Sequence, residues 1–255
     1  CLEQKTSKAI GLRDEAAWQK IVADLPTYLD GDGLAYYFPP ADSGARRGSD
    51  TLTAYLLAAT NEAGYAIPQA SRDKMLDGLA AFVEGKVMRD FWSPQKDLDV
   101  RKLAALEALS RYNRVQPAML GSIQVNPNAW PTSGLLDWIG ILQRVSAIPE
   151  RDKKLEEADQ ILRARLNFQG TRMGFSNEEG DYWWWLMSSA DANANRLILL
   201  ELNHPAWRED LPRLIAGAIG RQQRGHWSTT TANVWGSLAL EKFARKFESE
   251  PVTGT

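Results

Sequence analysis

The sequence predicts an all-α fold in which helical hairpins form an α/α toroid. Two observations predict it. Apolar residues recur at three- and four-residue spacing along most of the chain, as in amphipathic helices, and several of these segments resemble one another, as repeated hairpins do. An open helical solenoid would show the same two features and is the alternative architecture. No Pro-rich or Gly/Ser-rich linker interrupts the pattern, so we expect one domain spanning residues 1–255.

Each expected helix combines this periodicity with residues that start or stop helices. Ser, Asp, Thr or Pro stand at the starts, and Gly or Asn stand near the ends. A first short helix begins at Cys1, and almost no strand is expected. The later helices are predicted at residues 15–29, 49–64, 72–85, 97–112, 133–147, 149–167, 189–203, 208–223 and 229–247.

Three segments look like copies of one unit. Residues 33–59 and 174–202 share, in order, a glycine, an apolar and aromatic cluster, a polar loop, a serine and a Leu-rich helix. Residues 225–240 form a shortened third version. Hairpins repeated around a ring bury one face of each helix against its neighbours, which is how units too small for a core of their own become stable.

Composition excludes several classes of protein. The 255 residues carry a net charge of −2 with acidic and basic residues interspersed, so no basic patch indicates nucleic acid as a partner. No apolar run is long enough to cross a bilayer. The one cysteine allows no internal disulfide. Because the chain starts abruptly at Cys1, without an initiator Met or signal peptide, we expect it to be a piece of a larger protein.

That single cysteine carries the strongest chemical signal. Residues three apart on a helix share a face, so the Cys1 thiol and the Gln4 carboxamide are expected to be neighbours. Attack of the sulfur on the amide carbon of Gln4, with loss of ammonia, would give an internal thioester. A helix N-terminus favours negative charge and therefore the thiolate, both as nucleophile and as later leaving group. Glu3 lies inside the motif, and its own role is left open between a chemical one and compensation of the helix dipole.

Two other interpretations of Cys1 compete with the thioester. A lone cysteine is most often a small buried hydrophobe. A cysteine at the first position can also bear the lipid of a bacterial lipoprotein, although such residues usually head a flexible tether and the sequence after Cys1 has the pattern of a helix.

The motif resembles a known family. CLEQ followed by Thr6 and Ser7 is similar to the C-x-E-Q-x-T-S thioester motif of bacterial alpha-2-macroglobulins, which are related to the complement components. The segments LAYYFP, SDTLTAYLLAATNEAGY and GHWSTTTANVWGSLAL also look like the thioester domain of that family, so the resemblance covers nearly the whole chain. Lys5 departs from the pattern, since threonine is common at that position.

The resemblance implies a single-use protease trap rather than an enzyme, with no cofactor and no metal. An attacking protease cuts a bait region elsewhere in the parent protein, the thioester becomes exposed, and a lysine of the protease attacks the Gln4 carbonyl and expels the Cys1 thiolate. Other domains of the parent would shield the bond until then. The resemblance also implies a periplasmic location and a role in bacterial defence, and it leaves open whether a lipid anchors the parent to a membrane.

The histidines bear on the nucleophile that the thioester accepts. A related complement subset uses a histidine on a nearby loop to redirect the reaction toward hydroxyls. We place that loop at residues 126–133, which contain no histidine. His204 and His226 lie elsewhere; His204 is interpreted as a turn residue and His226 as a capping or packing residue. Direct attack by amines is therefore predicted.

A toroidal carbohydrate-active enzyme, a glycosidase or lyase with an accidental CLEQ, is the alternative function. Trp183, Trp184 and Trp185 could line a sugar-binding cleft, and acidic residues at 31–33, 97–99 and 178–181 could supply a pair of carboxylates. Three consecutive aromatic residues cannot all face one cleft, and each acidic group falls in an expected turn or helix start, so packing roles are favoured.

Overall fold

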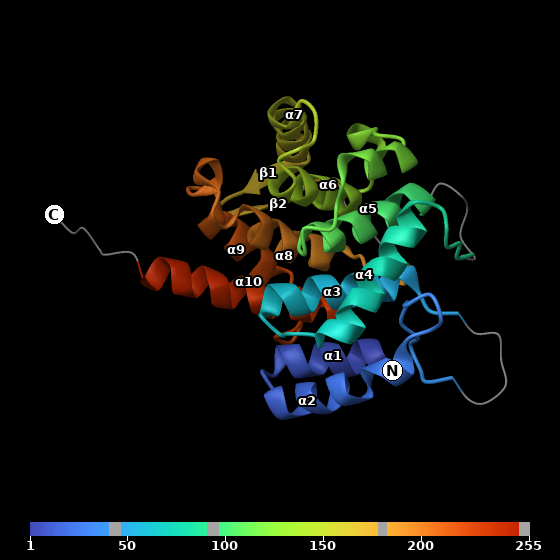
Figure 1. The fold of residues 1–255 in the computed structure, drawn as a ribbon. Coiled ribbons are helices and arrows are strands. Elements are labelled where there is room, and N and C mark those ends of the chain that lie inside the picture. The colour runs from blue at the N-terminus through green and yellow to red at the C-terminus, as the bar shows by residue number, and fades with distance from the viewer. Residues whose placement is uncertain (41–46, 91–96, 178–182, 250–255) are drawn as a thin grey trace.

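The computed structural model describes residues 1–40, 47–90, 97–177 and 183–249, and this part of the chain is mostly helical (Figure 1). The predicted all-α class is therefore confirmed. Short 3₁₀ helices connect some of the elements: η1 (Leu25–Tyr28), η2 (Pro117–Ser122), η3 (Pro127–Ala129), η4 (Trp184–Leu186) and η5 (Pro205–Trp207). The α-helices are α1 (Leu2–Gly11), α2 (Glu15–Asp24), α3 (Asp50–Ala63), α4 (Gln69–Val83), α5 (Asp97–Ser110), α6 (Thr132–Arg144), α7 (Arg151–Ala164), α8 (Ala190–Glu201), α9 (Leu211–Gly220) and α10 (Thr230–Glu248).

The three segments predicted to be copies begin their helices in the same way. Ser49, Ser189 and Thr229 are the N-caps of α3, α8 and α10. In each case the side-chain oxygen accepts a hydrogen bond of 3.1 Å from the backbone N–H three residues later. This satisfies a donor that the first turn of a helix otherwise leaves without a partner. The helix starts predicted for these segments are confirmed.

A β-hairpin stands where the sequence predicts the end of a helix, so the expected helix at 149–167 is too long. The helix α7 ends at Ala164, and β1 (Leu166–Gln169) then pairs antiparallel with β2 (Arg172–Phe175). Gly170 has a φ of 64° in the turn between them, a conformation that favours glycine. Two four-residue strands are too short for their alternation to stand out from the helical periodicity around them.

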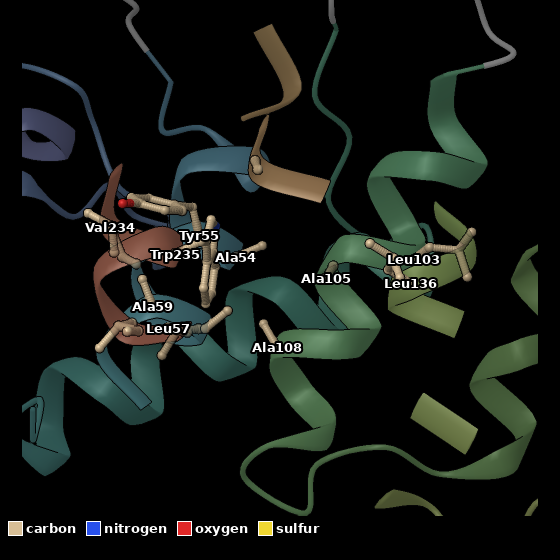
Figure 2. Close-up of a cluster of buried hydrophobic side chains, with 14 of the residues drawn as sticks. Ala54, Tyr55, Leu57, Ala59, Leu103, Ala105, Ala108, Leu136, Val234 and Trp235 are labelled. Carbon is tan, nitrogen blue, oxygen red and sulfur yellow. The ribbon is translucent and has the colours of Figure 1, made fainter. Parts of the chain in front are cut away.

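Five helices pack in a closed sequence of neighbours. Contacts join α3 to α5, α5 to α6, α6 to α8, α8 to α10, and α10 back to α3. Figure 2 shows part of the apolar core, in which side chains of α3, α5, α6 and α10 meet. These contacts do not establish that the helices form the hairpins of an α/α toroid, so the toroid stays a prediction. The first helix, α1, packs outside this group against α2, α3 and α10 (Figure 1).

Buried ion pairs join the helices of this group. Arg111 of α5 binds Glu62 of α3 and Glu107 of its own helix at 2.7 Å each, and Arg144 of α6 also binds Glu107 at 2.7 Å. Burial raises the pKa of Glu107, but the guanidinium groups of Arg111 and Arg144 outweigh it and hold this pKa at about 2. Because removing one partner leaves a buried charge uncompensated, these pairs constrain how the helices can pack.

Close packing between α10 and the loop before it gives a test of the fold. A Cβ atom on Gly236 would lie 2.1 Å from the ring of Trp227, whose Nε1 donates to Ala218 O at 2.9 Å and so holds the ring in place. We expect Gly236→Ala to lower the free energy of unfolding by about 1–3 kcal/mol through overpacking. Gly11→Ala is the matched control, since a Cβ there meets nothing within 4 Å. Equal urea midpoints for the two variants would contradict the packing described.

Glu201 at the end of α8 gives a pH-dependent test. Its side chain is buried, and Oε1 has no hydrogen-bond partner among the described residues. Burial, reinforced by the charge of Asp159 and opposed by Arg163, raises the pKa of Glu201 to about 8. An unfolded glutamate titrates near pH ~4.3, so the folded chain binds more protons between about pH 4.3 and 8, and its stability falls as pH rises through that window.

We expect Glu201→Gln, which mimics the protonated acid, to unfold at a higher urea concentration than the unsubstituted chain at about pH 8. Its stability should also fall less than that of the unsubstituted chain as pH rises from about 4.3 to 8. Glu209→Gln, a change at an exposed glutamate, is the control. Identical profiles of stability against pH for Glu201→Gln and the unsubstituted chain would show that Glu201 ionises normally.

Candidate functional site at the tip of helix α1

Cys1 and Gln4 form the first turn of α1. Cys1 is the N-cap, and its Sγ accepts a hydrogen bond from the Gln4 backbone N–H at 3.5 Å. Cysteine is not among the residues usually preferred at this position, which are Ser, Thr, Asp and Asn. Cys1 and Gln4 thus occupy the N-cap and the third helical position, and the contact between them joins the sulfur to the Gln4 backbone N–H. That the Gln4 carboxamide reaches the sulfur stays a prediction.

The residues of this first turn differ in exposure. The Gln4 side chain is exposed and Cys1 is partly buried, whereas Leu2 and Glu3 between them are buried. The Leu2 backbone N–H donates to Tyr37 O at 2.8 Å, which ties the first helical residue to the LAYYFP segment. An electrophile formed by Cys1 and Gln4 would thus stand at the surface on a helix whose other face is fixed.

The Glu3 carboxylate accounts for much of that fixation. Its Oε1 accepts hydrogen bonds from Ser7 Oγ at 2.7 Å and from Thr230 Oγ1 at 2.9 Å, while Oε2 lies 4.0 Å from Cys1 Sγ. Ser7 Oγ is in turn 2.7 Å from the hydroxyl of Tyr55. Glu3 therefore does more than compensate the helix dipole, because it links α1 to α3 and α10. The sequence carried no signal for Tyr55 and Thr230, which lie far along the chain from Glu3.

The turn position expected of His204 is confirmed, whereas the capping or packing role expected of His226 is not, because Thr229 caps α10 and His226 is exposed. His226 is exposed, and its Nδ1 lies 3.0 Å from the backbone oxygen of Trp227. His204 precedes η5 as its N-cap. Residues 126–133, the predicted position of the complement histidine loop, form η3 and the start of α6.

Most of the features that could support a carbohydrate-active site contact other side chains of the chain, although Trp184 is 56% exposed. Trp183 and Trp185 stack on each other with ring centroids 5.8 Å apart, and Trp184 meets Trp185 edge-on at 5.9 Å. Asp32 pairs with Arg89 at 2.8 Å, and Asp97 is buried at the start of α5. The acidic residues at 178–181 lie outside the described residues.

Two other buried carboxylates, Asp137 and Glu107, are paired with arginines. Asp137 of α6 binds Arg196 of α8, and Glu107 binds two arginines as described above. Burial raises the pKa of Asp137 to about 6, against the opposing charge of Arg196. Both carboxylates are buried and held by guanidinium groups, which is typical of a structural role, although both line one pocket with Trp235.

The described part of the chain lacks two further kinds of feature. No cluster of three or more His, Cys, Asp and Glu side chains there could hold a metal ion. No described helix combines the length and the apolar character needed to cross a membrane.

The fold belongs to a class already seen in large bacterial proteins. No protein-family model and no curated protein sequence matches the chain. Its neighbours among solved structures are bacterial alpha-2-macroglobulins. These matches are 14–20% identical in sequence to the chain, so the likeness shows a shared fold.

Three of these structures indicate how far the likeness extends. The native alpha-2-macroglobulin of Escherichia coli matches with a TM-score of 0.69 at 17% identity, over 95% of this chain and 16% of its own. The trypsin-activated form of the Escherichia coli protein matches with a TM-score of 0.67 at 17% identity, over 98% of this chain and 17% of its own. The Salmonella protein reacted with methylamine matches with a TM-score of 0.65 at 20% identity, over 95% of this chain and 16% of its own. The chain thus spans about a sixth of the proteins that it resembles.

Proposed function

We propose that this chain is the thioester domain of a bacterial alpha-2-macroglobulin-like protease inhibitor, and that Cys1 and Gln4 form its internal thioester. One observation carries the proposal. On a fold shared with bacterial alpha-2-macroglobulins, the lone cysteine caps a helix whose third residue is an exposed glutamine. Neither feature alone would suffice, since the fold can host other functions and a lone cysteine is commonly inert.

The bond would form by condensation of two side chains. The Cys1 sulfur attacks the carboxamide carbon of Gln4, the C–N bond breaks, and ammonia leaves with the proton that the thiol gives up. The positive end of the helix dipole at α1 favours the thiolate that attacks. Because the same dipole favours the thiolate as a leaving group, the product is an acyl group poised for transfer.

In capture, an amine nitrogen would replace the sulfur on the same acyl carbon. A protease lysine attacks the acyl carbon of Gln4, an amide bond forms, and the Cys1 thiolate leaves. Each molecule reacts once, so the domain would act as a covalent trap and would not turn over. Since the loop at 126–133 carries no histidine, we expect amines to be preferred over hydroxyls.

A shield is needed until the protease arrives, because an exposed thioester would react with water or any free amine. The exposed position of Gln4 suggests that other domains of the parent chain supply this cover. Cleavage of a bait region in the parent would remove it. The proposal also includes a periplasmic location, where proteases from competitors or hosts would be met, and it leaves the choice between a soluble and a lipid-anchored parent open.

Methylamine tests the thioester directly. Incubation of the full-length protein with methylamine should place the methylamide on Gln4 and release one free thiol at Cys1, because a small amine reaches a shielded thioester. Peptide mass spectrometry locates the adduct, and a thiol reagent counts the sulfhydryl. An unmodified Gln4 in the intact parent would refute the function and would favour the carbohydrate-active alternative.

Removal of the nucleophile separates cleavage from capture. In the full-length protein with Cys1→Ala, we expect the bait to be cut as in the unsubstituted protein. The covalent protease adduct should disappear, as seen by denaturing gel electrophoresis. Cys1→Ser is the matched control for the helix, since serine caps well and preserves the start of α1 without supplying a thiolate. Persistence of the covalent adduct in both variants would show that the acyl donor lies elsewhere.

A further inference from the structure

We propose that Tyr55 is a positioning residue for the Cys1 and Gln4 pair, acting from α3 through Ser7 and Glu3. The inference rests on the proposed thioester function and adds a residue to it. Tyr55 lies 48 positions from Ser7 along the chain, and its hydroxyl is the point where α3 contacts the polar side of α1.

The hydrogen bonds have only one consistent direction when Glu3 is ionised. A carboxylate only accepts, so Ser7 gives its single hydroxyl proton to Glu3 Oε1 at 2.7 Å. Ser7 Oγ can then only accept from its other neighbour, and Tyr55 must donate to it, also at 2.7 Å. The relay therefore runs from the Tyr55 hydroxyl to Ser7 and on to Glu3. Loss of the first donor would leave Ser7 Oγ with an unused acceptor in a buried place.

The start of this relay is firmly held. Tyr55 is 5% exposed, and its ring meets Trp235 of α10 edge-on with centroids 6.3 Å apart (Figure 2). Burial raises the pKa of Tyr55 above the ordinary range of a phenol, and the charge of Glu3 adds to this, so the hydroxyl stays protonated and available as a donor near neutral pH. A rigid donor in the core thus determines where the flexible carboxylate of Glu3 lies.

The end of the relay sets the orientation of the site. Successive residues of an α-helix are about 100° apart around its axis. An inward Glu3 therefore fixes the direction of Gln4, the next residue, and of Cys1, two residues before it. Thr230, which is exposed, gives Glu3 a second donor from α10. Formation of the thioester needs the sulfur and the amide carbon near contact distance, and small displacements of reacting groups slow such reactions strongly.

Tyr28 provides a matched control. It is also 5% exposed, and its hydroxyl also contacts α1, accepting from Lys5 Nζ at 3.2 Å, but no contact leads from it to Glu3. We expect Tyr55→Phe in the full-length protein to lower the fraction of molecules labelled by methylamine at Gln4 by about three- to tenfold, as loss of one buried hydrogen bond would. Tyr28→Phe should be labelled at Gln4 to the same extent as the unsubstituted full-length protein.

Thermal unfolding of each variant, followed by circular dichroism, separates positioning from stability. A positioning role predicts loss of labelling in Tyr55→Phe out of proportion to any fall in Tm, and a similar loss in Ser7→Ala, which breaks the relay one step later. Glu3→Gln keeps an acceptor oxygen for Ser7 and should retain more labelling than either. Should Tyr55→Phe fail to fold, Ser7→Ala and Glu3→Gln decide the question.

Failure of this inference is distinguishable from failure of the proposed function. A parent protein without label at Gln4 would refute the thioester itself. A labelled parent together with unimpaired Tyr55→Phe and Ser7→Ala would overturn only the positioning role. Equal losses of labelling and of Tm in Tyr55→Phe and Tyr28→Phe would also overturn it, because they would show that either hydroxyl serves stability alone.

Discussion

The buried carboxylate of Glu3 is the interaction on which the geometry of the site depends. A buried carboxylate is costly unless it is hydrogen-bonded, and Oε1 of Glu3 accepts hydrogen bonds from donors on both α1 and α10. Because one of those donors, Ser7, is itself bound to Tyr55 of α3, the tip of α1 cannot rotate without breaking contacts to two other helices. The partly buried Cys1 and the exposed Gln4 are thereby carried on a fixed support.

The support extends inward through the helices that α1 rests on. The helices α3 and α10 belong to the closed sequence of neighbours, and ion pairs such as Arg111 with Glu62 and Arg144 with Glu107 join the helices of that group. Chemistry that depends on contact between a sulfur and a carboxamide needs this kind of rigidity, since a loosely held helix tip would seldom bring the two groups together. The Glu3 relay links the surface motif to the same framework.

Low sequence identity together with a shared fold has a simple physical explanation. Helical cores tolerate many exchanges of apolar residues as long as volume and pattern are kept, so the likeness to the alpha-2-macroglobulins of Escherichia coli and Salmonella persists at 17–20% identity. A thioester has no such freedom, because only a thiol and a carboxamide at the right spacing can condense. A four-residue motif can therefore carry more functional information than the remaining length of the chain.

The sequence by itself determined the helical class, most helix starts and the place of Cys1 and Gln4 in one helical turn, because all of these depend on residues close together in the chain. Its prediction of one long helix at 149–167 was wrong at the β-hairpin, where two very short strands are stabilised by packing against α9. Only the tertiary structure decided what Glu3 does. Its partner Thr230 lies 227 positions away, and Tyr55 lies 48 positions from Ser7, and no local pattern predicts which distant hydroxyl a buried carboxylate will reach.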